Sequence, residues 1–108
     1  GVDIMRNDSG VCVFSIEDGE WLQYTIQAKA GKYQIGFKTA AEGSVSQLSL
    51  QVNDKCIVSK LALPGTGGEG NFTTTWVKNI SLPAGITRLK VLADKGGFNL
   101  QSILFIKE

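Results

Sequence analysis

The chain has 108 residues, the length of one ordinary domain, and 43% of them are hydrophobic, which is enough to fill one core. Its 11 Lys and Arg balance 10 Asp and Glu, so the composition lacks the basic field that favours nucleic acid or an anionic membrane as a partner. Two Cys and no His exclude a structural zinc site of the usual ligands and the Ser-His-Asp and Cys-His catalytic groups.

Alternation of apolar and polar residues with a period of two predicts strands through nearly the whole chain. The first clear strand spans residues 21–28, and a second spans 32–38, directly after Gly31. The residues predicted to face the core are Leu22, Tyr24 and Ile26 in the first strand, and Tyr33, Ile35 and Phe37 in the second. We interpret this pair of strands as a hairpin.

Two further strands, at 48–52 and 56–58, are joined by Asn53 and Asp54, a pair typical of a tight turn. Residues 64–71 contain four Gly and one Pro, which predicts an exposed loop. The last strands are expected at 76–82, 86–92 and 98–106. Because Trp76 is in phase with Ile80 and Leu82, we place it in the core.

About eight or nine short strands without helical periodicity predict an all-β fold: an antiparallel two-sheet β-sandwich, with a small barrel as the alternative. Residues 1–108 are expected to form one domain, because no linker or internal repeat divides them. Cys12 and Cys56 are expected either to form a disulfide or to pack as buried free thiols.

Acidic residues are the only candidates for catalysis, and three of them lie just before Trp21: Glu17, Asp18 and Glu20. A glycosidase would need two carboxylates across a cleft. The Asp18-Gly19 pair instead favours a solvated turn between two strands, so we predict no enzymatic activity. Trp21 itself lies on the face opposite Leu22, and two interpretations remain open: a loop covers it, or it serves as a platform for a ligand.

Four blocks of sequence, in order, resemble the family 6 carbohydrate-binding modules: IEDGEWLQYTI at 16–26, AGKY at 30–33, LPAG at 82–85 and GGFNL at 96–100. The resemblance implies a β-jelly roll that binds a polysaccharide or oligosaccharide in a cleft formed by loops at one end, with a second site on the concave face in some members. It also implies a secreted or cell-surface module, extracellular or periplasmic and bacterial, attached to the catalytic domain of a glycoside hydrolase.

The same resemblance guides the choice of site residues. The family's cleft uses two aromatic rings and an Asn, and the Asn is retained as Asn99. One ring position is occupied by Ser15, with Phe14 beside it, and the other by Glu69, with Phe72 nearby. Three alternatives follow: Glu69 and a differently placed ring such as Phe14 or Phe72 bind another sugar, which we favour; the concave face is the working site; or binding is lost.

The family's usual first strand and its Glu-Ala-Glu-like run have no match here, so we expect the chain to lack one or two N-terminal strands. A structural calcium ion is possible by resemblance, but no residue is assigned to it. The alternative function is a structural or interaction β-sandwich that packs on a catalytic domain through an exposed apolar patch, for which Trp21 is the candidate, with sugar binding lost.

Overall fold

A computed structural model describes residues 2–5, 14–16, 19–43, 45–68 and 70–108. These residues form nine strands: β1 (Val2–Met5), β2 (Phe14–Ile16), β3 (Trp21–Ala28), β4 (Gly31–Ala40), β5 (Ser46–Val52), β6 (Lys55–Leu63), β7 (Thr73–Leu82), β8 (Gly85–Lys95) and β9 (Phe98–Lys107). Within these ranges there is no helix long and apolar enough to cross a membrane.

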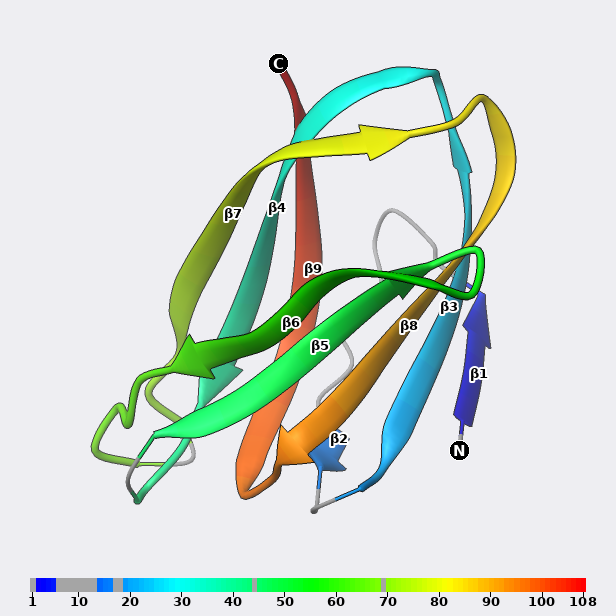
Figure 1. The fold of residues 1–108 in the computed structure, drawn as a ribbon. Helices are drawn as coiled ribbons and strands as arrows, with labels where there is room; N and C mark the ends of the chain where they lie inside the picture. Colours follow the sequence, from blue (N-terminus) through cyan, green and yellow to red (C-terminus); the bar gives the residue numbers. More distant parts are fainter. Residues whose placement is uncertain (1, 6–13, 17–18, 44, 69) are drawn as a thin grey trace.

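The strands make two sheets that pack face to face (Figure 1). One sheet has five strands in the order β1-β3-β8-β5-β6, and the other has four in the order β2-β9-β4-β7. Neighbours are antiparallel except β1 and β3, which run parallel. The predicted all-β two-sheet sandwich is therefore confirmed.

The core lies between the sheets and contains the residues that the alternation assigned to it. The side chains with no exposed surface include Ile35 and Phe37 from β4, Leu48 and Leu50 from β5, and Leu89 from β8. Leu22, Ile26 and Tyr33 are also buried, while Tyr24 packs against the core at its margin. Burying a side chain of this kind contributes about 1.5–3 kcal/mol, so these residues dominate the stability of the sandwich.

The predicted hairpin of residues 21–28 and 32–38 is wrong, because β3 pairs with β1 and β8 whereas β4 pairs with β7 and β9. The chain reverses near Gly31, as expected, but crosses from one sheet to the other. The Tyr33 hydroxyl donates a hydrogen bond of 2.6 Å to the Lys29 carbonyl and so closes this connection. Both strands therefore present their apolar faces to the same core from opposite sides.

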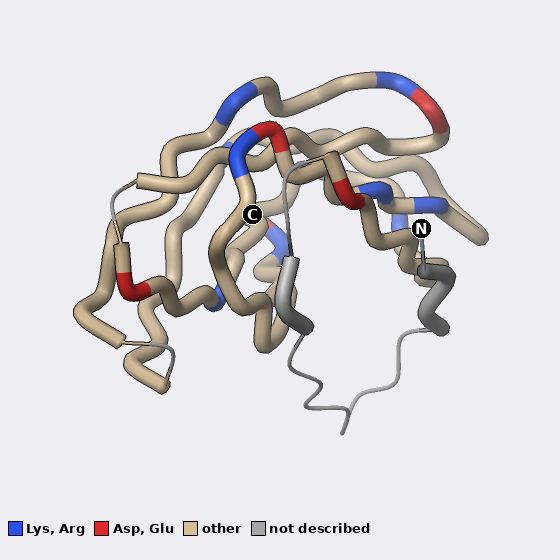
Figure 2. Tube along the Cα trace, turned by 90° about the horizontal axis from the view of Figure 1, so that it is seen from below, with Lys and Arg blue, Asp and Glu red and all other residues tan. Residues whose placement is uncertain are grey.

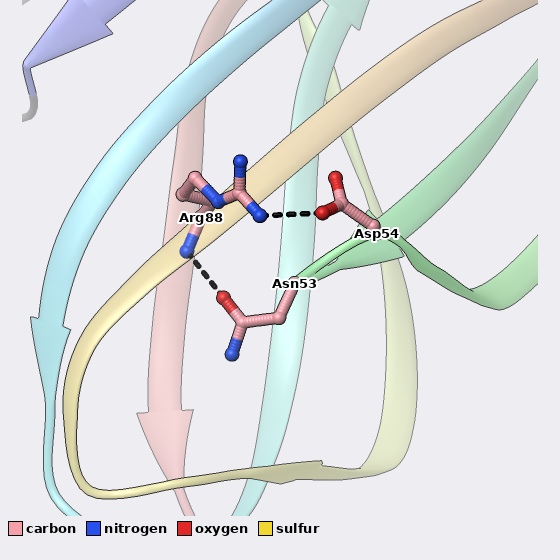
Figure 3. A network of polar contacts seen from close by, with 3 residues as sticks. All are labelled: Asn53, Asp54 and Arg88. Atoms are coloured by element: carbon pink, nitrogen blue, oxygen red, sulfur yellow. Dashed lines mark hydrogen bonds and ion pairs between the residues drawn. The ribbon is translucent and has the colours of Figure 1, made fainter.

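The turn predicted at Asn53 and Asp54 is confirmed, and it joins β5 to β6. Both residues have positive φ, 47° and 69°, as a two-residue type I′ hairpin requires. The Asn53 side-chain oxygen accepts a hydrogen bond of 2.9 Å from the Arg88 backbone N–H, and the Asp54 carboxylate accepts one from the Arg88 guanidinium (Figure 3). These contacts tie the turn to β8 of the same sheet.

The assignment of Trp76 to the core is wrong: its side chain is 39% exposed. Tyr33 pairs with Ile80 but Ile35 pairs with Val77, so β7 holds one residue more than β4 across this interval. The extra residue is accommodated at Asn79, whose φ of +61° marks a β-bulge. A bulge reverses the alternation, and Trp76 therefore faces outward although Ile80 and Leu82 face inward.

Cys56 is a free thiol on the outer side of β6, and it is exposed. Its sulfur lies 3.5 Å from the Val58 carbonyl. Burial as a free thiol is therefore wrong for Cys56, because its strand packs Val58 and Leu61 inward instead. Cys12 lies outside the described residues.

Candidate functional site

Two of the predicted site residues occupy directly opposed positions on neighbouring strands. In the antiparallel pair of β2 and β9, Ser15 pairs with Asn99 and Phe14 pairs with Leu100. Opposed residues of such a pair have Cα atoms about 4.5–5.5 Å apart. Residues 15 and 99 are roughly 80 positions apart in the sequence, and the short strand β2 nevertheless lies beside the start of β9.

The pairing continues across the whole four-stranded sheet at this end. Leu100 also pairs with Thr39 of β4, and Thr39 pairs with Thr73 of β7. The next row holds Ser15, Asn99 and Ala40. Phe72 directly precedes Thr73 and is half-buried. Residues from β2, β9 and the start of β7 therefore meet at one end of one sheet.

The glycine-rich loop is fixed to the same end of the sheet through Ala41, the residue after Ala40. The Thr66 N–H donates to the Ala41 carbonyl at 2.9 Å, and the Ala41 N–H donates to the Thr66 hydroxyl at 3.0 Å. The hydroxyl oxygen also lies 3.0 Å from the Gly68 carbonyl oxygen, to which it donates. Asn99 and Thr66 are thus positioned by consecutive residues of β4 and its extension.

The loop backbone leaves little freedom here. A Cβ added at Gly65 would lie 2.1 Å from the Gly43 carbonyl oxygen, so only glycine fits. Exposed residues of the predicted loop include Pro64, Gly67 and Asn71, which confirms the expected exposure for its described part. Glu69 lies outside the described residues, as do Glu17 and Asp18.

Trp21 belongs to the other sheet, so the structure does not bring it to the sheet that carries Asn99. Its ring is half-buried on the outer face of β3, and the Lys90 ammonium lies 4.3 Å from the ring centroid. The group over the ring is therefore a residue of β8, whereas one of the two open interpretations had a loop cover it. This cation–π contact was not predicted, although the alternation within the predicted strand at 86–92 already indicates that Lys90 faces outward.

A polar surface surrounds Trp21 on the five-stranded sheet. One row across the strands contains Gln23, Lys90, Gln51 and Cys56. Beside it, the Ser49 hydroxyl donates to the Asp94 carboxylate at 2.6 Å and accepts from the Lys60 N–H at 3.0 Å. Hydrogen-bonding side chains around a partly exposed indole make this face a second candidate surface for a hydroxyl-rich ligand.

The described residues contain no group of three or more Cys, Asp or Glu side chains that could hold a metal ion. The calcium ion suggested by resemblance therefore has no assigned ligands. Figure 2 shows positive and negative residues interspersed along the described trace.

Comparison with known proteins identifies the class. Residues 1–107 match the sequence model of the family described as carbohydrate binding module (family 6). The chain belongs to this family, whose members are non-catalytic carbohydrate-binding domains. Among curated proteins, none matches the sequence.

Solved carbohydrate-binding modules are similar to this chain in fold. A family 6 module from Cellvibrio mixtus lichenase 5A, in complex with cellotriose, is 28% identical to this chain, with a TM-score of 0.77. The match covers 94% of this chain and 82% of that module. The C-terminal family 6 module of a marine laminarinase from Zobellia galactanivorans is 24% identical, with a TM-score of 0.73. The match covers 84% of this chain and 75% of that module. A family 35 module from Paenibacillus barcinonensis is 18% identical, with a TM-score of 0.80, and the match covers 93% of this chain and 80% of that module.

Proposed function

We propose that this chain is the non-catalytic glycan-binding module of a polysaccharide-degrading enzyme, secreted or displayed at the surface of a bacterium. Its site is the loop end of the four-stranded sheet, defined by Ser15, Asn99 and the segment 66–72. The observation that carries the proposal is the pairing of Asn99 with Ser15 on one side and Ala40 on the other, with Thr66 bonded to Ala41.

The chemistry of this site suits a hydroxyl-rich ligand. An Asn amide both donates and accepts, so Asn99 matches a sugar hydroxyl, and each such bond contributes about 0.5–1.5 kcal/mol. Phe72, half-buried directly before Thr73, is the first candidate for stacking on the apolar face of a sugar, and Phe14, which pairs with the buried Leu100, is the second. Glu69 belongs to the same loop, and a carboxylate at this point would accept from two hydroxyls.

The cellotriose bound by the Cellvibrio module supports an oligosaccharide ligand of the β-glucan type as the first to test. Since Ser15 and Glu69 stand where the family usually has rings, we propose that the preferred glycan is more polar or more branched than cellotriose.

The test is a titration of the purified chain with a panel of soluble oligosaccharides, followed calorimetrically. Asn99→Ala should weaken binding about tenfold, the loss of one or two hydrogen bonds. Gln27→Ala is the matched control, because Gln27 is an exposed amide at the far end of β3. A melting curve for each variant separates lost binding from lost folding. Unchanged affinity in folded Asn99→Ala would reject the loop-end site, and no binding to any glycan would reject the function.

The face around Trp21 is the second candidate for the same function. Trp21→Ala, with Asn99 intact, should leave affinity unchanged if the loop end is the site. A loss of binding in this variant alone would move the site to the five-stranded sheet.

A further inference from the structure

The outer face of the four-stranded sheet carries a row of exposed apolar side chains that the loop-end site does not use. Trp76 is 39% exposed, Leu104 38% and Ile106 50%. Gly36 in β4 pairs with Trp76 on one side and with Leu104 on the other. Three strands therefore contribute to one row, and Ile106 lies in the neighbouring row beside Gln34.

Gly36 allows the indole to lie down on the sheet. A Cβ added at Gly36 would come within 2.8 Å of ring atom Cζ3 of Trp76 and within 2.8 Å of the Thr74 methyl carbon. The six-membered ring therefore occupies the space above β4 that any other residue would fill. With one face supported by the backbone, the ring turns a flat surface outward.

The strands of this sheet carry charges of a single sign, and the acid directly after β9 is Glu108, whose carboxylate accepts a hydrogen bond of 3.3 Å from the Asn79 N–H of β7. The strands β2, β4, β7 and β9 contain four lysines, Lys32, Lys38, Lys78 and Lys107, and no Asp or Glu. Lys38 follows the inward-facing Phe37 and pairs with Thr74, one row from Trp76. Lys78 follows Val77, which packs against the core, and is exposed on the other side of the ring. An ammonium group thus stands on each side of Trp76 along the strand direction.

We propose that this outer face, made of Trp76, Gly36, Leu104, Lys38 and Lys78, is a second binding site, and that its ligand is an anionic polysaccharide. The apolar face of one sugar ring stacks on the indole. Carboxylate or sulfate groups of neighbouring sugars pair with the two ammonium groups, and Thr74 and Ser102, which flank Lys38 in its row, supply hydroxyls. A linear polysaccharide with a charge on each sugar unit fits a row of this kind, because one polymer molecule can reach both lysines.

The charge and size of the face argue for this ligand over two others. A second copy of the chain would bring lysines against lysines, which is repulsive. A stable protein interface buries about 800 Å² on each partner around an apolar centre, whereas only three exposed apolar side chains lie here.

The experiment measures retardation of the chain in native gels that contain polygalacturonate, dextran sulfate or neutral dextran. The unmodified chain should be retarded by one or both acidic polymers and not by dextran, and retardation should fall as salt rises. The polygalacturonate and dextran sulfate arms distinguish carboxylate from sulfate as the recognised group.

Three variants locate the binding. Trp76→Ala and the double variant Lys38→Gln/Lys78→Gln should each weaken binding at least about tenfold. Lys55→Gln/Lys95→Gln is the charge-matched control, because both lysines are exposed on the five-stranded sheet. Asn99→Ala should bind the acidic polymer normally, which separates this site from the loop end.

Several results would overturn the proposal. An equal loss of retardation in the Lys55→Gln/Lys95→Gln control would mean that net charge alone causes the retardation. Normal retention of folded Trp76→Ala would remove the indole from the site, and Trp76→Phe should retain part of the affinity. If the unmodified chain dimerises on a sizing column and Trp76→Ala does not, a second copy covers this face and the polysaccharide assignment is wrong.

Discussion

The Lys90 ammonium lies over the ring of Trp21, 4.3 Å from its centroid. The cation occupies one face of the indole, so a sugar cannot stack on that face while the lysine is there. The two residues come from neighbouring strands, β3 and β8, since Lys90 pairs with Gln23. A ligand that stacks on this face of Trp21 must first displace the lysine.

Replacing Lys90 with Ala should lower the free energy of unfolding by about 0.5–1 kcal/mol, the contribution of a cation–π contact at a partly exposed site. Urea denaturation measures this change. Lys95→Ala, on the same strand but exposed, is the control and should change stability less. If both variants unfold at the same urea concentration as the unmodified chain, the contact contributes nothing in solution.

Gly36→Ala should destabilise the fold by about 1–3 kcal/mol, because the added methyl would lie 2.8 Å from both the Trp76 ring and Thr74. In a Trp76→Ala background the same substitution should cost less, since half of the crowding is gone. A double-mutant cycle of unfolding free energies measures the difference. Additive effects would contradict the contact of the ring with β4.

Asn53→Ala should cost about 1–2 kcal/mol, since it places a residue with a Cβ at a φ of 47° and removes the acceptor for the Arg88 N–H. Asn53→Gly keeps the conformation and loses only the acceptor, so it should cost less. Thermal unfolding of the two variants checks the order. A smaller loss in the Ala variant would mean that backbone strain is unimportant at this turn.

Thr66→Ala should weaken glycan binding without unfolding the chain, because it removes the hydroxyl that accepts from the Ala41 N–H and leaves only the Thr66 N–H bond to hold the loop at this point. Thr66→Ser retains the hydroxyl and should bind normally. The affinity of both variants for the best glycan of the panel, measured by titration, checks this. Equal affinities would show that the loop takes no part in the site.

Local signals predicted much of this fold. The alternation at residues 21–28 and 32–38 identified the buried residues, and Asn53-Asp54 identified a turn whose positive φ angles these residues tolerate. Both inferences depend on neighbours in sequence. The hairpin assigned to the same two strands failed because a reversal at Gly31 does not say which strand becomes the neighbour.

The candidate site depended on information that the sequence pattern does not hold. Asn99, Ser15 and Phe72 were chosen by resemblance, but their positions on adjacent rows follow from pairings between distant strands. Trp76 was placed inside because a bulge at Asn79 reverses the phase between it and Ile80. A single inserted residue is invisible to period-two counting unless a conformational signal such as Gly marks it.

Among the described strands, β5 and β6 alone are consecutive neighbours in one sheet, and every other connection changes sheet. The final strand β9 must therefore dock between β2 and β4 before the four-stranded sheet is complete. On a ribosome, the four-stranded sheet cannot close until the ten residues of β9 have emerged, so the packed sandwich should acquire its protease resistance late. A chain cut just before Phe98 should stay unfolded, and its ligand site should be lost with it.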